Sequence, residues 1–141
     1  MTWVGSDWGL FFDHKEHQVE VDGFAAQVVD AAIAIHKVLG PGLLESAYVA
    51  ALEIECAERG LAFAREVPIQ ATYRGRPLGV AYRADLVIES RLLVEVKSVA
   101  ELRPEHSAQT LSYLRLGGYR LGLLLNFSAP LMKQGIKRIA N

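Results

Sequence analysis

Three charged side chains stand in segments otherwise built from Leu, Val and Ile. Asp85 lies near the end of one apolar run, residues 78–88, and Glu95 and Lys97 lie in the next, residues 92–97. Burying an unpaired carboxylate costs several kcal/mol, so these groups must be paired, hydrogen-bonded or bound to a metal. Two facing carboxylates can hold a hard divalent cation and leave sites for water and a phosphate oxygen. The residue types therefore indicate metal-assisted chemistry on a phosphate group.

Lys97 is placed to take part in that chemistry. Side chains alternate along a strand, so Glu95 and Lys97 project to the same face. The Lys97 ammonium could position or help to deprotonate an attacking water, or offset the charge that builds on phosphorus. The alternative is a structural ion pair across the strands between Lys97 and a carboxylate.

The turn between the two runs decides whether Asp85 joins that face. A two-residue turn at Glu89-Ser90 sets Asp85 opposite Val94 and sends its carboxylate to the wrong side. A three-residue turn, residues 89–91, sets Asp85 opposite Glu95. We therefore predict the three-residue turn or a bulge.

The elements around these residues follow from hydrophobic periodicity and turn chemistry. The first 22 residues show no sustained period, and we treat them as an N-terminal extension of uncertain structure. Residues 23–141 are expected to form one domain of the α/β class. The expected helices span 23–39, 43–59 and 105–116, and the expected strands span 63–73, 78–88, 92–97, 119–127 and, as a short last strand, 136–139.

Composition narrows the class of protein. With 141 residues, 51% hydrophobic and 22% charged, the chain should fold as one globular domain. Its single cysteine, Cys56, excludes an internal disulfide and a thiol-only zinc site, which indicates a reducing compartment. We find no apolar stretch of membrane-spanning length and no signal-peptide pattern, and predict a cytoplasmic protein without a membrane partner.

Charge is distributed unevenly along the chain. Residues 1–70 hold 11 acidic and 4 basic side chains, whereas residues 71–141 hold 5 acidic and 11 basic ones. Such asymmetry permits a nucleic-acid partner, although charges scattered over a solvated surface would give the same counts. The candidate phosphate contacts are Arg74, Arg76, Arg83, Arg103 and Arg115, each of which could equally be a plain surface charge.

The fingerprints of several other enzyme classes are missing from the sequence. It contains no phosphate-cradling GxxxxGK[ST], no GxGxxG, no HExxH and no GxSxG. Nucleotide hydrolase, dehydrogenase, zinc protease and esterase functions are therefore disfavoured.

The charged residues also carry a family resemblance. Asp85 followed by Glu95-Val96-Lys97 resembles the signature of the PD-(D/E)XK nuclease superfamily, with Ala84 where the motif has proline. The segment from Gly42 to Tyr48 is similar to the GxxExxY pattern that names one family within it. Further segments resemble that family in order, over roughly residues 24–139: Gly40-Pro41-Gly42, residues 106–109, 112–114, 123–127 and 136–139. The resemblance implies a restriction-endonuclease-like core, with a central mixed β-sheet flanked by helices in the order helix, helix, three-strand meander, helix, strand.

The resemblance also implies roles for individual residues. Asp85 and Glu95 would be ligands of Mg²⁺ or Mn²⁺, the carbonyl of Val96 a third ligand, and Lys97 the catalytic lysine. Glu45 would be a further ligand or would orient a metal-bound water. Without the resemblance, Glu45 could equally well be an ordinary helix residue that faces solvent.

Four more residues complete the candidate site. Gln109 and Tyr113 lie four apart on one helix face, and their spacing resembles the Gln-x-x-x-Tyr motif of RecB-type nucleases, where the pair supports the site and the nucleic-acid backbone. Tyr48 shares a face with Glu45, and His106 could touch a phosphate. The structural alternatives are core packing for both tyrosines and a local helix cap for His106.

The leading hypothesis is a Mg²⁺-dependent nuclease that hydrolyses phosphodiester bonds, with DNA as the expected substrate. The main alternative is a catalytically inactive module of the same fold that binds nucleic acid or a protein partner, and a third is a purely structural subunit. Clustered carboxylates favour the enzyme, because they repel a phosphate unless a metal is present. A chain this small would bind weakly alone, so we expect a homodimer.

Overall fold

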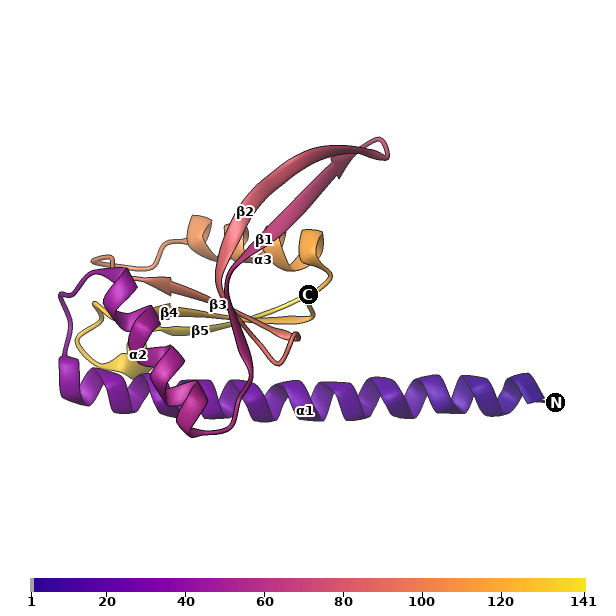
Figure 1. Ribbon diagram of the computed structural model, residues 1–141, viewed down its shortest axis with the longest axis horizontal. Coiled ribbons are helices and arrows are strands. Elements are labelled where there is room, and N and C mark those ends of the chain that lie inside the picture. The colour runs from indigo at the N-terminus through magenta and orange to yellow at the C-terminus, as the bar shows by residue number, and fades with distance from the viewer. Residues whose placement is uncertain (1) are drawn as a thin grey trace.

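A computed structural model gives the fold of the chain (Figure 1), describing the backbone of residues 2–141 and the side chains of residues 17–141. Its helices are α1 (Thr2–Leu39), α2 (Glu45–Glu58) and α3 (Pro104–Gly117), with a 3-10 turn, η1 (Met132–Gly135). Its strands are β1 (Phe63–Tyr73), β2 (Arg76–Ile88), β3 (Leu92–Lys97), β4 (Leu121–Asn126) and β5 (Ile136–Ala140).

The strands form one mixed sheet in the order β1-β2-β3-β4-β5. The strands β3 and β4 are parallel, because α3 crosses over between them, and the other neighbouring pairs are antiparallel. This arrangement confirms the expected α/β class, with a three-strand meander followed by a helix and a further strand. It is consistent with a restriction-endonuclease-like core.

Helices cover the sheet on both faces. The larger apolar cluster joins α1 and α2 to the face that carries Leu92, Val94 and Val96 of β3, and the smaller one joins α3 to the face that carries Leu93. Strand β4 is buried along its whole length, as its continuous apolar run predicts. Within the described residues, no helix combines the length and the apolarity that crossing a membrane requires.

Helix α1 is longer than the sequence predicts. The expected helix began at Gly23, but α1 begins at Thr2 and runs beyond the sheet toward the N-terminus (Figure 1). The buried positions of α1 run from Val21 to Ile35 and belong to the cluster that packs on the sheet, and the periodic pattern, which starts at Phe24, covers most of this range but not Val21. A helix segment that extends past the sheet has no apolar surface to match, so an apolar stripe is a poor guide to where the helix begins.

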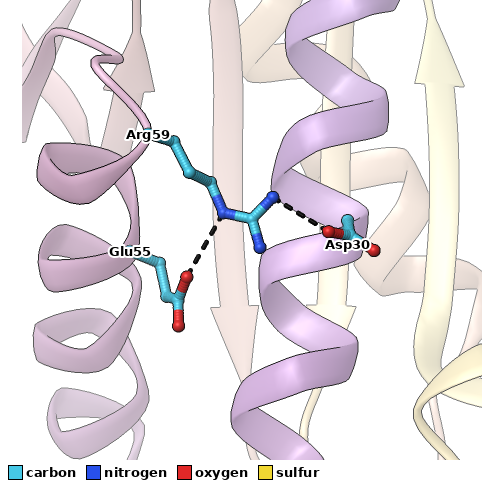
Figure 2. A network of polar contacts seen from close by, with 3 residues as sticks. All are labelled: Asp30, Glu55 and Arg59. Atoms are coloured by element: carbon cyan, nitrogen blue, oxygen red, sulfur yellow. Dashed lines mark hydrogen bonds and ion pairs between the residues drawn. The ribbon is translucent and has the colours of Figure 1, made fainter.

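A short polar network fastens α2 to α1 (Figure 2). The Arg59 guanidinium binds Asp30 of α1 through Nη1 at 2.9 Å and Glu55 of α2 through Nε at 3.2 Å. Asp30 is largely exposed, so its pair with Arg59 contributes little stability by itself. The packing of α2 on α1 is stabilised mainly by buried apolar side chains, including Leu52 and Cys56 of α2.

The turn between β2 and β3 has the predicted three residues. Leu86 pairs with Val94, Val87 with Leu93 and Ile88 with Leu92. Residues Glu89 and Ser90 adopt positive φ angles of 52° and 58°, which close the hairpin. This register directs Asp85 toward Glu95, as the turn argument requires.

Candidate active site

The candidate site lies where β2 and β3 separate. The last residue pair of the β2–β3 ladder is Leu86 with Val94, and Asp85 and Glu95 are the next residues beyond it on the two strands. Beyond that point, side chains replace the backbone ladder: the amide of Asp85 donates to Glu95 Oε1 at 3.3 Å, and the amide of Val96 donates to Asp85 Oδ2 at 2.8 Å. The two carboxylates therefore occupy the gap between the strands.

Glu95 is the most strongly perturbed acid of the pair. It is only 1% exposed, and this burial, followed by the nearby Asp85 carboxylate, raises the pKa of Glu95 to about 7. A hydrogen bond from the Tyr82 hydroxyl, the Asp85 amide and the Lys97 charge act in the opposite direction. Glu95 is thus a buried acid whose negative charge is only partly compensated by its protein neighbours.

Asp85 is a partly buried acid whose pKa is also raised. Burial raises its pKa, the Val96 amide lowers it, the Glu45 carboxylate raises it and the Lys97 ammonium lowers it, in decreasing order of effect. Both Glu45 and Lys97 are therefore close enough to act on Asp85 electrostatically. The structure brings together Asp85, Glu95, Lys97 and Glu45, four of the residues singled out in the sequence.

Tyr82 is a site residue that was not among the candidates from the sequence. Its hydroxyl donates to Glu95 Oε2 at 2.7 Å, and its ring stacks on Tyr113 with centroids 3.8 Å apart and planes 4° apart. Strict alternation along β2 would place Tyr82 and Asp85, three residues apart, on opposite faces. Ala84 and Val87, also three residues apart, both pack in the smaller apolar cluster, so alternation along β2 is interrupted between them, and both Tyr82 and Asp85 reach Glu95.

Tyr113 lies beside the site through this stack. Burial, followed by the Glu95 carboxylate, raises the pKa of the Tyr113 phenol, which places its hydroxyl within electrostatic reach of Glu95. Tyr113 thus combines apolar packing with proximity to the buried acid.

Glu45 approaches the site from the first turn of α2. Its Oε1 accepts a hydrogen bond of 3.3 Å from the amide of Ser98, immediately after Lys97. Ser98 also donates through Oγ to the carbonyl of Leu43 at 2.8 Å and shares a hydrogen bond with Ser128 Oγ. Ser98 therefore joins the end of β3 to the start of α2.

Tyr48 has a positioning role. It is fully buried and stacks on Phe127 at 4.3 Å between centroids. Its hydroxyl donates to the carbonyl of Gly40 at 2.6 Å and accepts from the amide of Leu43 at 3.1 Å. Within the Gly42-x-x-Glu45-x-x-Tyr48 segment, the tyrosine fixes the loop from which the glutamate begins its helix.

Removing the Tyr48 hydroxyl should weaken this loop. We expect Tyr48→Phe to keep the stack on Phe127 but to lower the free energy of unfolding by about 1–2 kcal/mol, because two backbone groups lose their partner. Urea unfolding of the variant measures the change. Tyr73→Phe is the matched control, since the Tyr73 side chain is 63% exposed and its loss of a hydroxyl should leave stability unchanged. Equal unfolding midpoints for both variants would contradict the role of Tyr48.

Asn126 fixes the loop that follows Lys97. It is 2% exposed, its Oδ1 accepts from the amide of Val99 at 3.0 Å, and its Nδ2 donates to the carbonyl of Val99 at 2.9 Å. Oδ1 also accepts from the Ser128 amide. The only sequence signal is a polar residue that ends the apolar run of β4, and such a residue is too common to identify its partner.

Gln109 and His106 are not joined to this cluster. Gln109 is exposed on α3, and its side chain makes no hydrogen bond with the residues that the structure describes. His106 Nδ1 accepts a hydrogen bond from the amide of Arg103 at 2.9 Å, so its ring caps the start of α3 and has the structural role that the sequence offered as an alternative.

The donor chemistry of the site fits a hard divalent cation. No group of three or more His, Cys, Asp or Glu side chains in the described part of the chain is spaced to enclose a metal. Mg²⁺, however, commonly binds through one or two carboxylates together with waters and substrate phosphates. Asp85 and Glu95 supply two such carboxylates, and a bound cation would offset both the burial and the Asp85 charge that raise the pKa of Glu95.

The fold and this site define an α/β protein of the restriction-endonuclease-like class. The model of the PD-(D/E)XK nuclease superfamily matches residues 22–139, and the chain belongs to this superfamily. No curated protein and no solved structure matches the chain significantly. Membership suggests a nuclease and agrees with the expectation drawn from Asp85 and Glu95-x-Lys97.

Proposed function

We propose that this chain is a metal-dependent nuclease that hydrolyses phosphodiester bonds in DNA. The observation that carries the proposal is the pair of carboxylates, Asp85 and Glu95, held in the gap between β2 and β3 with the Lys97 charge acting on both. Clustered acids of this kind oppose the binding of a phosphate by themselves. They favour it when a divalent cation is present.

The carboxylates of Asp85 and Glu95 would hold Mg²⁺ or Mn²⁺, with the Val96 carbonyl as a third ligand and Glu45 as a further ligand or as the acceptor for a bound water. The cation supplies charge stabilisation for the reacting phosphate and a water of lowered pKa. Asp85 is held in place by the Val96 amide, and Glu95 by Tyr82, so neither carboxylate has to reorganise on binding.

Lys97 would act on the reacting phosphodiester directly. Lys97 is half-buried at the end of β3, within electrostatic reach of both acids. In that position it orients the attacking water or stabilises negative charge on the phosphate, and the low polarity of the surroundings strengthens either effect. Tyr82 and Tyr113 would position Glu95, while Gln109 on the exposed side of α3 would contact the nucleic-acid backbone.

A second candidate function is binding without catalysis. It is favoured by the hydrogen bonds that Glu95 already accepts, one on each carboxylate oxygen, from Tyr82 and from the Asp85 amide, because they leave fewer lone pairs for a cation. A chain of this kind would bind nucleic acid or a protein partner through the same fold. The cleavage experiment below separates the two functions.

The narrower assignments from the sequence are part of the same proposal. We assign the chain to the GxxExxY family on the segment from Gly42 to Tyr48, with the RecB-type pair Gln109 and Tyr113, and place the protein in the cytoplasm as a homodimer. The buried free thiol of Cys56 fits a reducing compartment. Sedimentation equilibrium tests the dimer, and a chain that is purely monomeric at micromolar concentration would disprove this assignment.

The decisive experiment is cleavage of labelled single- and double-stranded DNA and RNA in Mg²⁺, Mn²⁺ or EDTA. We expect cleavage of DNA in either metal and none in EDTA. Glu95→Ala, purified identically, controls for contaminating nuclease and should be inactive. If the wild type and the variant are both folded and equally inert, the chain is a binding module. If both cleave equally, the activity belongs to a contaminant.

A further inference from the structure

The hairpin of β1 and β2 rises out of the sheet as a two-stranded arm (Figure 1). We define the arm as residues 70–81, which include the turn at Arg74-Gly75. Residues 72–80 are all exposed, although they are paired in strand geometry up to Tyr73 and Arg76. Strand β2 pairs with β3 only between residues 86 and 88, so the arm has no neighbouring strand on that side.

Two bulges and a glycine with a positive φ angle shape the arm. The register between β1 and β2 shifts twice, after Ile69 and after Ala71, and each shift adds a residue to β2. Such bulges bend and twist a ribbon. Gly79 takes a φ of 94°, which a larger residue would resist. Pro77 withholds an amide from any further strand, which opposes edge pairing with a second copy of the chain.

The arm carries only positive charge. No Asp or Glu occurs between residues 67 and 84, and this stretch contains Arg74 and Arg76 at the tip and Arg83 at the base, whereas the whole chain has a net charge of −1. The Arg74 guanidinium lies 5.7 Å from the centre of the Tyr73 ring, which is itself 63% exposed. The local charge is therefore opposite in sign to that of the remainder of the chain.

We propose that the arm binds the sugar–phosphate backbone of double-stranded DNA by lying in its major groove, with Arg74 and Arg76 on the phosphates. The major groove of B-form DNA admits a two-stranded β-ribbon, whereas the major groove of an RNA duplex is too narrow for side chains to enter. The inference deepens the proposed function and rests on it for the position of the substrate, because β2 also carries Asp85.

The spacing along β2 sets the reach of the contact. Arg76 and Asp85 are nine residues apart, which corresponds to roughly 25–30 Å of bulged strand. This is somewhat less than one turn of B-form DNA, about 34 Å. The arm therefore reaches phosphates most of a helical turn away from the bond at Asp85, and its contacts add affinity without reading sequence.

The test measures binding separately from cleavage. Fluorescence anisotropy follows a labelled 30-base-pair DNA duplex in EDTA, from about 50 to about 200 mM salt. Each phosphate contact contributes about 0.9 to the slope of log affinity against log salt concentration. We expect Arg74→Ala with Arg76→Ala to lower that slope by about 2 and to weaken binding at least about tenfold at low salt.

A matched variant controls for net charge. Lys37→Ala with Lys133→Ala removes the same two charges from exposed positions at the end of α1 and in η1, and should leave the slope as in the wild type. Both double variants replace exposed side chains, so thermal unfolding should occur at the wild-type temperature. Labelled duplex RNA and single-stranded DNA of the same length are titrated over the same range of salt, and sedimentation velocity reports the oligomeric state.

Four results would overturn the proposal. These are no binding of duplex DNA by the wild type, an unchanged slope in the arm variant, an equal loss of slope on duplex RNA or single-stranded DNA, or a change of oligomeric state without a change in DNA binding. The last result would make the arm an interface between copies. A chain that binds through the arm but does not cleave would disprove the nuclease alone, whereas cleavage with an unchanged slope would disprove the arm alone.

Discussion

Lys97→Ala should lower the rate of phosphodiester cleavage by about 100- to 1000-fold at saturating metal, the usual effect of removing one group that stabilises charge in a transition state. The reason is the position of the ammonium, which acts on both Asp85 and Glu95 from the end of β3. Because the proposed role is exerted on the reacting phosphate, the loss should fall on kcat rather than on substrate binding.

Single-turnover cleavage of duplex DNA by purified variants measures this effect. Lys97→Arg keeps the positive charge but spreads it over a planar guanidinium group, so it should recover only part of the wild-type cleavage rate. Lys37→Ala, an exposed lysine far along α1, should cleave as the wild type does. If Lys97→Ala retains more than about a tenth of the wild-type rate, the lysine belongs to a structural ion pair and has no part in the reaction.

The stability of the metal-free chain should fall as the pH rises from 5 to 8. Glu95 has a pKa of about 7 in the folded chain against 4.5 as a free side chain. Between these values the folded state holds a proton that the unfolded state has lost, so folding becomes less favourable as the pH rises. The loss is complete above pH 7 and amounts to about 3 kcal/mol, and Asp85, whose pKa is also raised, adds to it in the same direction.

Urea unfolding in EDTA at pH 5 and pH 8 gives the difference. Glu95→Gln serves as the control because it removes the titrating group and nearly preserves its volume, and its stability should change much less over the same range. At pH 8 the metal-free variant should be more stable than the metal-free wild type. Mg²⁺ should restore the wild type at pH 8 and have little effect on the variant. If the free energy of unfolding of the wild type and of the variant changes with pH in the same way, the pKa of Glu95 is not raised in the folded chain.

Residue spacing alone predicts the centre of the candidate site. Apolar alternation in residues 92–97 placed Glu95 and Lys97 on one face, and the same alternation required a three-residue turn that sets Asp85 opposite Glu95. It also located the helix that carries Glu45, since Gly40-Pro41-Gly42 ends one helix and starts the next. These features are local or depend on a single hairpin, so residue spacing is enough to specify them.

The side chains that surround that centre are set by the packing of distant elements against one another. Tyr82 reaches Glu95 because the alternation of β2 is interrupted near Asp85, and Asn126 and Ser98 hold the loop after Lys97 through contacts with distant segments. The same holds for Gln109, which shares a helix with Tyr113 yet lies exposed. Spacing along a strand or helix fixes the direction in which a side chain points. What it meets there depends on how the other elements pack, and that is decided by the burial of apolar surface over the whole domain.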